Sequence, residues 1–103
     1  MITEYDQLYS LLQAQADAAG LNDAGLPIVR CEINPNNTCS LILSASRAKL
    51  TFVLGRMGDE YKIGYAYYPP GIKDPDWIDD VDAVNFTEKF ATQLVWTNFN
   101  LPA

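Results

Sequence analysis

The chain has 103 residues, a hydrophobic fraction of 49% and a formal net charge of −6. This length and composition suit one globular domain over residues 1–103 that buries a core without a metal or disulfides, and they exclude a disordered chain. The negative charge repels phosphate backbones and disfavours direct binding to nucleic acid. The N-terminus lacks a signal peptide, and no apolar run reaches the ~18–20 residues of a membrane helix, so we expect a cytoplasmic protein without a membrane partner.

The chain begins with a segment that has the period of an amphipathic helix. Thr3 and Asp6 resemble a capping box, and Gly20 stands where a left-handed residue would end the helix. We therefore predict a helix over residues 3–19. Its apolar stripe consists of Tyr5, Leu8, Leu12, Ala16 and Ala19.

After a loop at residues 21–27 the apolar period changes to two, which predicts β-strands. Four segments show this alternation, namely residues 28–34, 38–44, 47–54 and 60–68. The first two are joined by a proline- and asparagine-rich turn, and a loop at residues 35–37 would pair Ile33 with Cys39. That register places the apolar residues of both strands on one face. Short connections between the strands favour an antiparallel meander.

The last part of the chain is predicted to leave the sheet and to end in a second helix. Two adjacent prolines lack the donor that a strand needs, so residues 69–82 are predicted to form a long loop. The final helix is expected to begin near Asp82 or Asn85 and to run to about Asn98. Asn85 followed by Glu88 resembles a second capping box.

These elements predict an α+β fold, a four-stranded antiparallel meander sheet flanked by an N-terminal and a C-terminal helix. The two helices are the available cover for the apolar face of the sheet. The alternation directs Tyr61, Tyr65 and Tyr67 towards this core. The opposite face is predicted to meet solvent and carries Arg30, Glu32, Ser40, Ser44, Lys49, Thr51, Lys62 and Tyr68.

The residues available for chemistry argue against an enzyme. The sequence contains no histidine, which removes the commonest general base, the histidine-activated nucleophiles and most zinc and iron sites. Cys31 and Cys39 are interpreted as small apolar residues of the buried face, with a redox pair as the alternative. In the predicted register each cysteine faces an aliphatic residue, and a cytoplasmic location also disfavours a disulfide. No cofactor and no catalytic residue are expected.

Aspartates gather in the segment DPDWIDDVD at residues 74–82 and carry most of the net charge. Hard carboxylate oxygens are calcium ligands, but the segment lacks the spacing of an EF-hand, so no metal ligand is assigned. Two crowded carboxylates can also work as an acid and a base. The remaining alternatives are a solvated loop and a docking surface for a basic partner.

Aromatic residues beside this segment favour the docking surface. Tyrosine and tryptophan within a charged rim are over-represented where proteins bind proteins. Tyr68 is expected to face outwards near Trp77, and the alternative for Trp77 is that it folds back to close the edge of the core. The predicted partner-binding site consists of Tyr68, Asp74, Asp76, Trp77, Asp79 and Asp80.

The predicted function is that of a small acidic, non-catalytic interaction protein of inhibitor, immunity or adaptor type. It would dock a basic or amphipathic surface of a protein partner. Two alternatives stay open. An uncovered strand edge can pair with a second copy, which would give a homodimer or a self-associating structural protein. An enzyme without histidine would have to use Asp, Glu, Tyr, Lys or Cys.

One resemblance to a known family covers the first half of the chain. Residues 5–12, the GLP at 25–27 and the segment NTCSLIL at 37–43 resemble the first half of type III secretion chaperones, within residues 3–54. The resemblance implies an acidic dimer that begins with a helix and a meander and wraps an unfolded effector segment. After its third strand this chain continues into another strand, where that family has a dimerisation helix and two more strands. No binding residue is therefore carried over.

Overall fold

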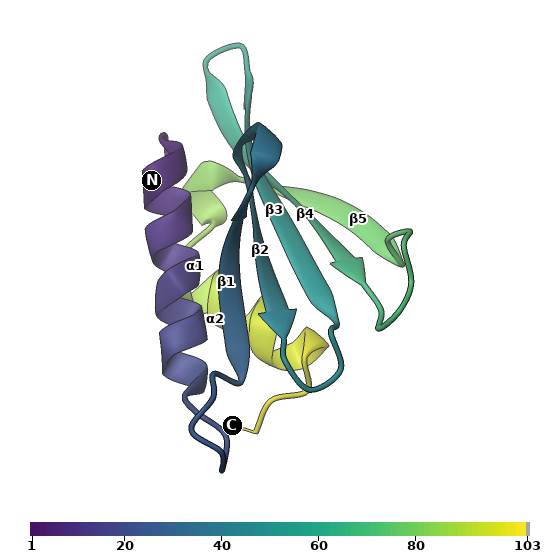
Figure 1. Ribbon diagram of the computed structural model, residues 1–103. Coiled ribbons are helices and arrows are strands. Elements are labelled where there is room, and N and C mark those ends of the chain that lie inside the picture. The colour runs from purple at the N-terminus through teal and green to yellow at the C-terminus, as the bar shows by residue number, and fades with distance from the viewer. Residues whose placement is uncertain (103) are drawn as a thin grey trace.

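The computed structural model describes residues 1–102 and contains two helices and a five-stranded antiparallel sheet. The helices are α1 (Tyr5–Ala19) and α2 (Glu88–Asn98), and the strands are β1 (Val29–Asn34), β2 (Thr38–Leu43), β3 (Lys49–Met57), β4 (Glu60–Tyr68) and β5 (Trp77–Asp82). The strands follow one another in chain order, so β1 and β5 are the two edges (Figure 1). The predicted α+β class with an antiparallel meander and two flanking helices is confirmed, with one strand more than expected.

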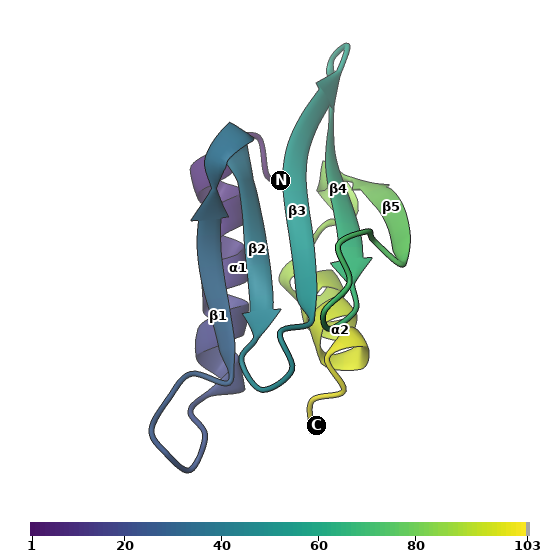
Figure 2. The ribbon, with the colours of Figure 1, turned by 45° about the vertical axis from the view of Figure 1, so that its right-hand side comes forward.

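Both helices cover the same face of the sheet. In Figure 2, α1 lies behind β1 and β2, and α2 lies behind the lower parts of β3 and β4. The core fills the space between the helices and this face, as the alternation predicted. Its fully buried residues include Leu8, Leu12, Val29, Cys39, Leu41, Leu50, Phe52, Ile63 and Val95. Within residues 1–102, no helix combines the length and the apolar composition needed to cross a bilayer.

The first hairpin has the predicted register. Asn34 pairs with Thr38 and Ile33 pairs with Cys39 across a three-residue turn. Ile33 is nevertheless 62% exposed, because it stands at the end of the edge strand β1.

Strand β3 is longer than predicted. It continues through Gly55 to Met57 and leaves only Gly58 and Asp59 as the turn to β4. Gly58 adopts a φ of +65°, which suits the first position of a tight hairpin turn. The predicted strands left residues 55–59 as the turn. The turn lies within this segment but contains only two residues.

The largest correction concerns residues 77–82, which were predicted to lie in a loop. They form β5 and pair with β4, from Tyr67 opposite Trp77 to Lys62 opposite Asp82. Aspartate is depleted in strands, so the composition of this segment favoured a loop. At the edge of a sheet the carboxylates keep their water, and charges are even favoured there because they discourage pairing with another chain. The connection between β4 and β5 is therefore residues 69–76.

The cap of α1 also differs from the prediction. The helix begins at Tyr5, and Oε1 of Gln7 accepts hydrogen bonds from the backbone N of Thr3 at 2.8 Å and of Glu4 at 3.1 Å. Gln7, not Asp6, therefore satisfies the free backbone groups at this helix start.

For α2, the predicted starts near Asp82 or Asn85 are wrong. Ala83–Asn85 form a short 3-10 turn, and Oγ1 of Thr87 accepts a hydrogen bond from Phe90 N at 3.2 Å. A threonine N-cap thus starts α2 directly after Thr87.

The face opposite the helices is called the outer face below. Most of its predicted members are solvated, but Ser40 is only 1% exposed. Its hydroxyl lies between Nδ2 of Asn34 at 2.7 Å and Oγ1 of Thr51 at 2.9 Å. This cross-strand chain of hydrogen bonds satisfies a polar group that its neighbours bury.

Candidate functional site

The structure divides the predicted partner-binding residues between two surfaces. Side chains alternate along a strand, so Trp77 and Asp79 lie on the helix-covered side of β5 while Asp80 lies on the outer face. Tyr68 faces outwards, as expected, and therefore lies on the opposite face from Trp77. Asp74 and Asp76 belong to the connection that leads into β5.

Trp77 closes the core at the edge of the sheet and keeps part of its ring exposed. It stacks on Tyr67 with ring centres 6.1 Å apart and meets Tyr65 edge-on at 5.8 Å. Tyr65 in turn contacts Phe90 of α2 at 6.0 Å. Burial, and then the negative charges of Asp79 and Asp80, raise the pKa of Tyr65. A half-buried tryptophan thus stands beside an exposed carboxylate.

Five exposed carboxylates lie along the β5 edge of the sheet, on both faces of β5 and in the connection before it. We call them, together with Trp77, the acidic edge, which consists of Asp74, Asp76, Trp77, Asp79, Asp80 and Asp82. On the outer face, Nζ of Lys62 lies 3.6 Å from Asp80 and 3.4 Å from Asp82. The hydrogen bond to Asp82 and then the charge of Asp80 raise the pKa of Lys62. Within residues 1–102, the other three carboxylates, those of Asp74, Asp76 and Asp79, form no ion pair.

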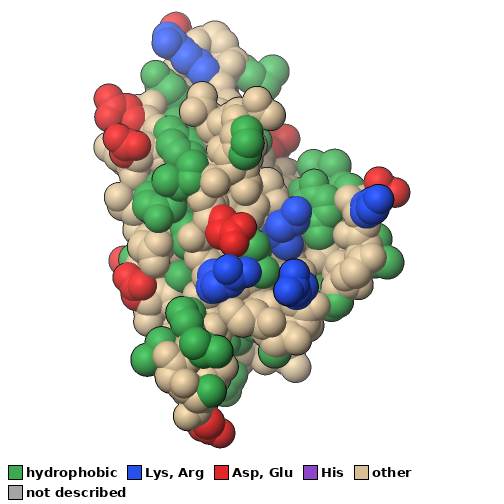
Figure 3. Space-filling model, viewed as in Figure 1, with side chains coloured by type: hydrophobic (Ala, Val, Ile, Leu, Met, Phe, Trp, Pro, Cys, Tyr) green, Lys and Arg blue, Asp and Glu red, His purple; other side chains and the backbone are tan. Residues whose placement is uncertain are grey.

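Tyr68 belongs to a different surface, which is positively charged. The register places Arg30, Ile42, Lys49 and Tyr68 in one row across β1, β2, β3 and β4. These residues line a depression of about 310 Å³ together with Glu32, Arg47, Pro69, Gly71 and Ile72. Figure 3 looks onto the outer face and shows basic side chains gathered near its middle, over the lower parts of the strands. We call this site the basic depression.

Arg30, Lys49 and Tyr68 were correctly predicted to share one face, but the predicted elements did not show that they line one depression. The strand register is the information that would have revealed the depression, because Ile42 pairs with both Arg30 and Lys49. Only the first of these pairings followed from the predicted turn. Arg47 was predicted to begin the strand at 47–54, but β3 begins at Lys49 and Arg47 lies in the connection before it.

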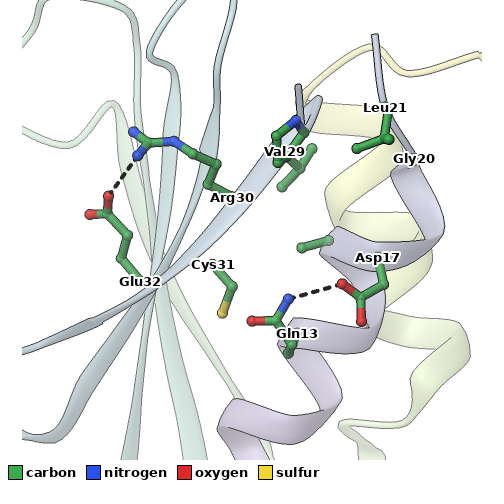
Figure 4. A pocket seen from close by; sticks show the side chains of 10 residues that line it. Gln13, Asp17, Gly20, Leu21, Val29, Arg30, Cys31 and Glu32 are labelled. Atoms are coloured by element: carbon green, nitrogen blue, oxygen red, sulfur yellow. Dashed lines mark hydrogen bonds and ion pairs between the residues drawn. The ribbon is translucent and has the colours of Figure 1, made fainter. Parts of the chain in front are cut away.

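A second hollow runs between α1 and the open edge of β1. It has a volume of about 420 Å³ and is lined by Gln13, Ala16, Asp17, Gly20, Leu21, Pro27, Val29, Arg30, Cys31 and Glu32. Figure 4 shows Cys31 pointing towards Gln13 of α1, with Arg30 and Glu32 on the other side of β1. Gln13 donates a hydrogen bond to Asp17 at 3.0 Å, so both polar side chains are held along this groove.

The two cysteines touch without facing each other. Cys31 pairs with Leu41 and Cys39 with Ile33, as predicted, but the two Sγ atoms approach diagonally to 3.3 Å. Both thiols are free. The hydrogen bond between them, and then burial, raise the pKa of Cys31. The same hydrogen bond lowers the pKa of Cys39, so the protonated, unreactive form is stabilised at Cys31.

The carboxylates of β5 do not converge on one point. Strand geometry sends Asp79 to one face and Asp80 to the other. Within residues 1–102, no group of three or more histidine, cysteine or acidic side chains is placed to hold a metal ion.

Comparison with known proteins adds no relative, because the chain matches no protein-family model, no curated protein and no solved structure.

Proposed function

We propose that this chain is a small acidic, non-catalytic interaction protein that binds a basic segment of a protein partner along the acidic edge. The observation that carries the proposal is the exposure of Asp76 and Asp79 beside Trp77 on an edge strand and the connection before it. This geometry favours a partner rich in lysine or arginine, as expected for an inhibitor, immunity or adaptor protein.

Electrostatics supports a basic partner rather than a second copy. The chain has a net charge of −6, so two acidic edges repel each other. Carboxylates without a cation of their own attract a positively charged surface and speed its association. The half-buried Trp77 side chain adds an aromatic group against which an arginine or lysine can pack, and Asp79 stands on the same side of β5 to pair with it.

Charge reversal at two positions tests this proposal. The variant carries Asp76→Lys and Asp79→Lys, which spares Asp80 and therefore its ion pair with Lys62. The matched control carries Asp23→Lys and Asp59→Lys, the same change in net charge at two exposed loop positions. Each protein serves as bait in a native lysate at low and at high salt. We expect one basic protein to bind the wild type and the control, to be released by salt, and to be lost from the Asp76/Asp79 variant.

Two outcomes would contradict the proposal. One is a salt-sensitive partner that the Asp76/Asp79 variant retains as strongly as the wild type does. The other is loss of the partner from both variants, which would show that net charge matters and the acidic edge does not. Melting curves of both variants establish that each is folded.

A second candidate function rests on the open edge of β1. Ser44 N donates to Ile28 O at 3.0 Å, and Leu43 N donates away from β1, to Ala48 O at 2.9 Å. In an antiparallel pair, every second residue of a strand hydrogen-bonds to the partner strand. These two bonds therefore determine which residues of β1 bond to β2 and which point away from it. The residues whose N–H and C=O groups point out of the sheet are Val29, Cys31 and Ile33.

Such an edge can accept an extended strand, either from a second copy or from an unfolded segment of another protein. This is the arrangement in which the resemblance to secretion chaperones would have a structural basis. Ile33→Pro removes one outward donor and leaves the β1–β2 bonds intact, because the Ile33 N–H faces away from β2. If the edge mediates dimerisation, light scattering gives a dimer for the wild type and a monomer for this variant. A monomeric wild type would leave the acidic edge as the surface to pursue.

A further inference from the structure

We propose that the basic depression is a binding site for a small organic anion, a ligand that carries a carboxylate or phosphate group. The site is independent of the acidic edge, from which it differs in the sign of its charge.

The gathering of cations is unexpected in so acidic a chain. The sequence has 7 basic residues against 13 acidic ones, yet Arg30, Arg47 and Lys49 all line this one depression. Arg30 is paired with Glu32 at 3.3 Å. Within residues 1–102, neither Arg47 nor Lys49 takes part in an ion pair. Like charges placed together repel one another, and a bound anion would relieve that repulsion.

The sheet holds two of these cations on either side of an apolar floor. Arg30 and Lys49 both pair with Ile42, from β1 and β3 respectively. Neighbouring strands lie ~4.8 Å apart, so the two backbone positions are separated by about twice that distance. This spacing leaves room between the side chains for a group of the size of a carboxylate or a phosphate.

Lys49 is oriented by a ring rather than by a carboxylate. Its Nζ lies 4.5 Å from the centre of the Tyr68 ring. No carboxylate within residues 1–102 pairs with this ammonium, so the N–H donors that point away from the ring are available to a ligand. Arginine adds a planar pair of donors that matches a carboxylate or a phosphate oxygen pair. The donors that an anion needs are therefore present before it binds.

The remaining walls suit a ligand with an apolar part. Tyr68, Pro69 and Ile72 line the side of the depression that faces the β4–β5 connection, and Ile72 is 56% exposed. The volume of about 310 Å³ matches the small end of the ~300–1,000 Å³ range of ligand pockets. A nucleic-acid duplex is too wide for it, and the −6 net charge of the whole chain opposes such a partner.

The experiment uses citrate and inorganic phosphate as probes, titrated separately into the isotope-labelled protein at constant ionic strength. We expect saturable shifts of backbone amide resonances at Arg30, Ile42, Arg47, Lys49 and Tyr68 by ~20 mM, a concentration that largely fills a millimolar site. The stronger of the two probes identifies the preferred headgroup. The variant carries Arg47→Gln and Lys49→Gln, and we expect its dissociation constant to rise at least ~10-fold because two charge-assisted contacts are lost.

The matched control carries Arg56→Gln and Lys89→Gln, which lowers the positive charge equally at two exposed positions outside the depression. It should bind the probes as the wild type does. The proposal is overturned if neither probe gives saturable shifts at these residues, or if the shifts are equally large in the Arg47/Lys49 variant. The wild-type titration decides this even if a variant fails to fold. Reversing Asp76 and Asp79 should leave anion binding intact, which separates this site from the proposed function.

Discussion

The ammonium of Lys49 lies over the Tyr68 ring, 4.5 Å from its centre, and the two residues are directly paired across β3 and β4. Both project from the outer face, where neither helix covers them. Trp77, in contrast, packs on the helix-covered face against two tyrosine rings. Two aromatic residues that are close in sequence therefore have different structural roles.

This difference predicts unequal costs of truncation. Trp77→Ala removes two ring–ring contacts at the rim of the core and should lower the free energy of unfolding by ~2–4 kcal/mol. Tyr68→Ala removes a solvated cross-strand pair and should cost only ~0.5–1 kcal/mol. Urea unfolding of the two variants beside the wild type measures both values. Equal costs would mean that Tyr68 is as deeply packed as Trp77.

The first hairpin was predictable because local and periodic signals agree there. Pro35 and the asparagines beside it specify a turn, and the alternation on both sides fixes which residues share a face. A one-residue slip would have turned Val29 and Leu41, which are 1% and 0% exposed, towards water. Burial on one face therefore leaves a single acceptable register.

β5 and the basic depression could not be predicted from the sequence, because both depend on pairings between strands that no local pattern specifies. The aspartates of β5 have no local preference for a strand, and only the free edge of β4 makes the pairing favourable. The row from Arg30 to Tyr68 needs three consecutive strand pairings to be known at once. The sequence predicted only the pairing of β1 with β2. The face on which Tyr68 lies was therefore predictable, but the residues that surround Tyr68 on that face were not.

A buried hydrogen bond between the helices gives a second prediction. Oγ1 of Thr92 lies 2.8 Å from Oε1 of Gln15 and 2.9 Å from the backbone O of Glu88, two acceptors that share its one proton, and Gln15 is only 2% exposed. Thr92→Val keeps the shape of the side chain and leaves the Gln15 oxygen without this donor. The free energy of unfolding should fall by ~1–3 kcal/mol, the cost of an unsatisfied buried polar atom.

Thr97→Val is the matched control, since Thr97 lies in the same helix and is exposed. It should change stability by less than ~0.5 kcal/mol. Chemical denaturation of both variants measures the difference. Equal effects would show that helix propensity, and not the link between α1 and α2, is responsible.

The environment of Tyr65 predicts a loss of stability at alkaline pH. Burial and the nearby Asp79 and Asp80 raise the pKa of Tyr65 in the folded protein. The folded state therefore holds this proton to a higher pH than the unfolded state does. Stability from this group is complete below the ordinary tyrosine pKa of ~10 and falls as the pH rises above it.

Absorbance titration of the tyrosines tests this directly. Tyr65 should ionise later than the exposed tyrosines, and so should Tyr5, whose pKa burial also raises. Tyr65→Phe should therefore remove one of two late ionisations. Asp79→Asn should move the ionisation of Tyr65 to lower pH, because one of the negative charges that raise the pKa is gone. A late absorbance change of undiminished amplitude in Tyr65→Phe would show that Tyr65 is not one of the two late tyrosines.

The contact between Cys31 and Cys39 predicts unusually slow alkylation of Cys31, while the same hydrogen bond lowers the pKa of Cys39. Their Sγ atoms are 3.3 Å apart, and the hydrogen bond they share, followed by burial, raises the pKa of Cys31. Because the thiolate is the nucleophile, iodoacetamide should alkylate Cys31 of the native protein at least ~10-fold more slowly than free cysteine at about pH 8. Cys39→Ala removes the hydrogen bond and should speed the reaction of Cys31. Mass spectrometry after timed quenching gives both rates, and a native rate equal to that of free cysteine would show that Cys31 is neither shielded nor hydrogen-bonded.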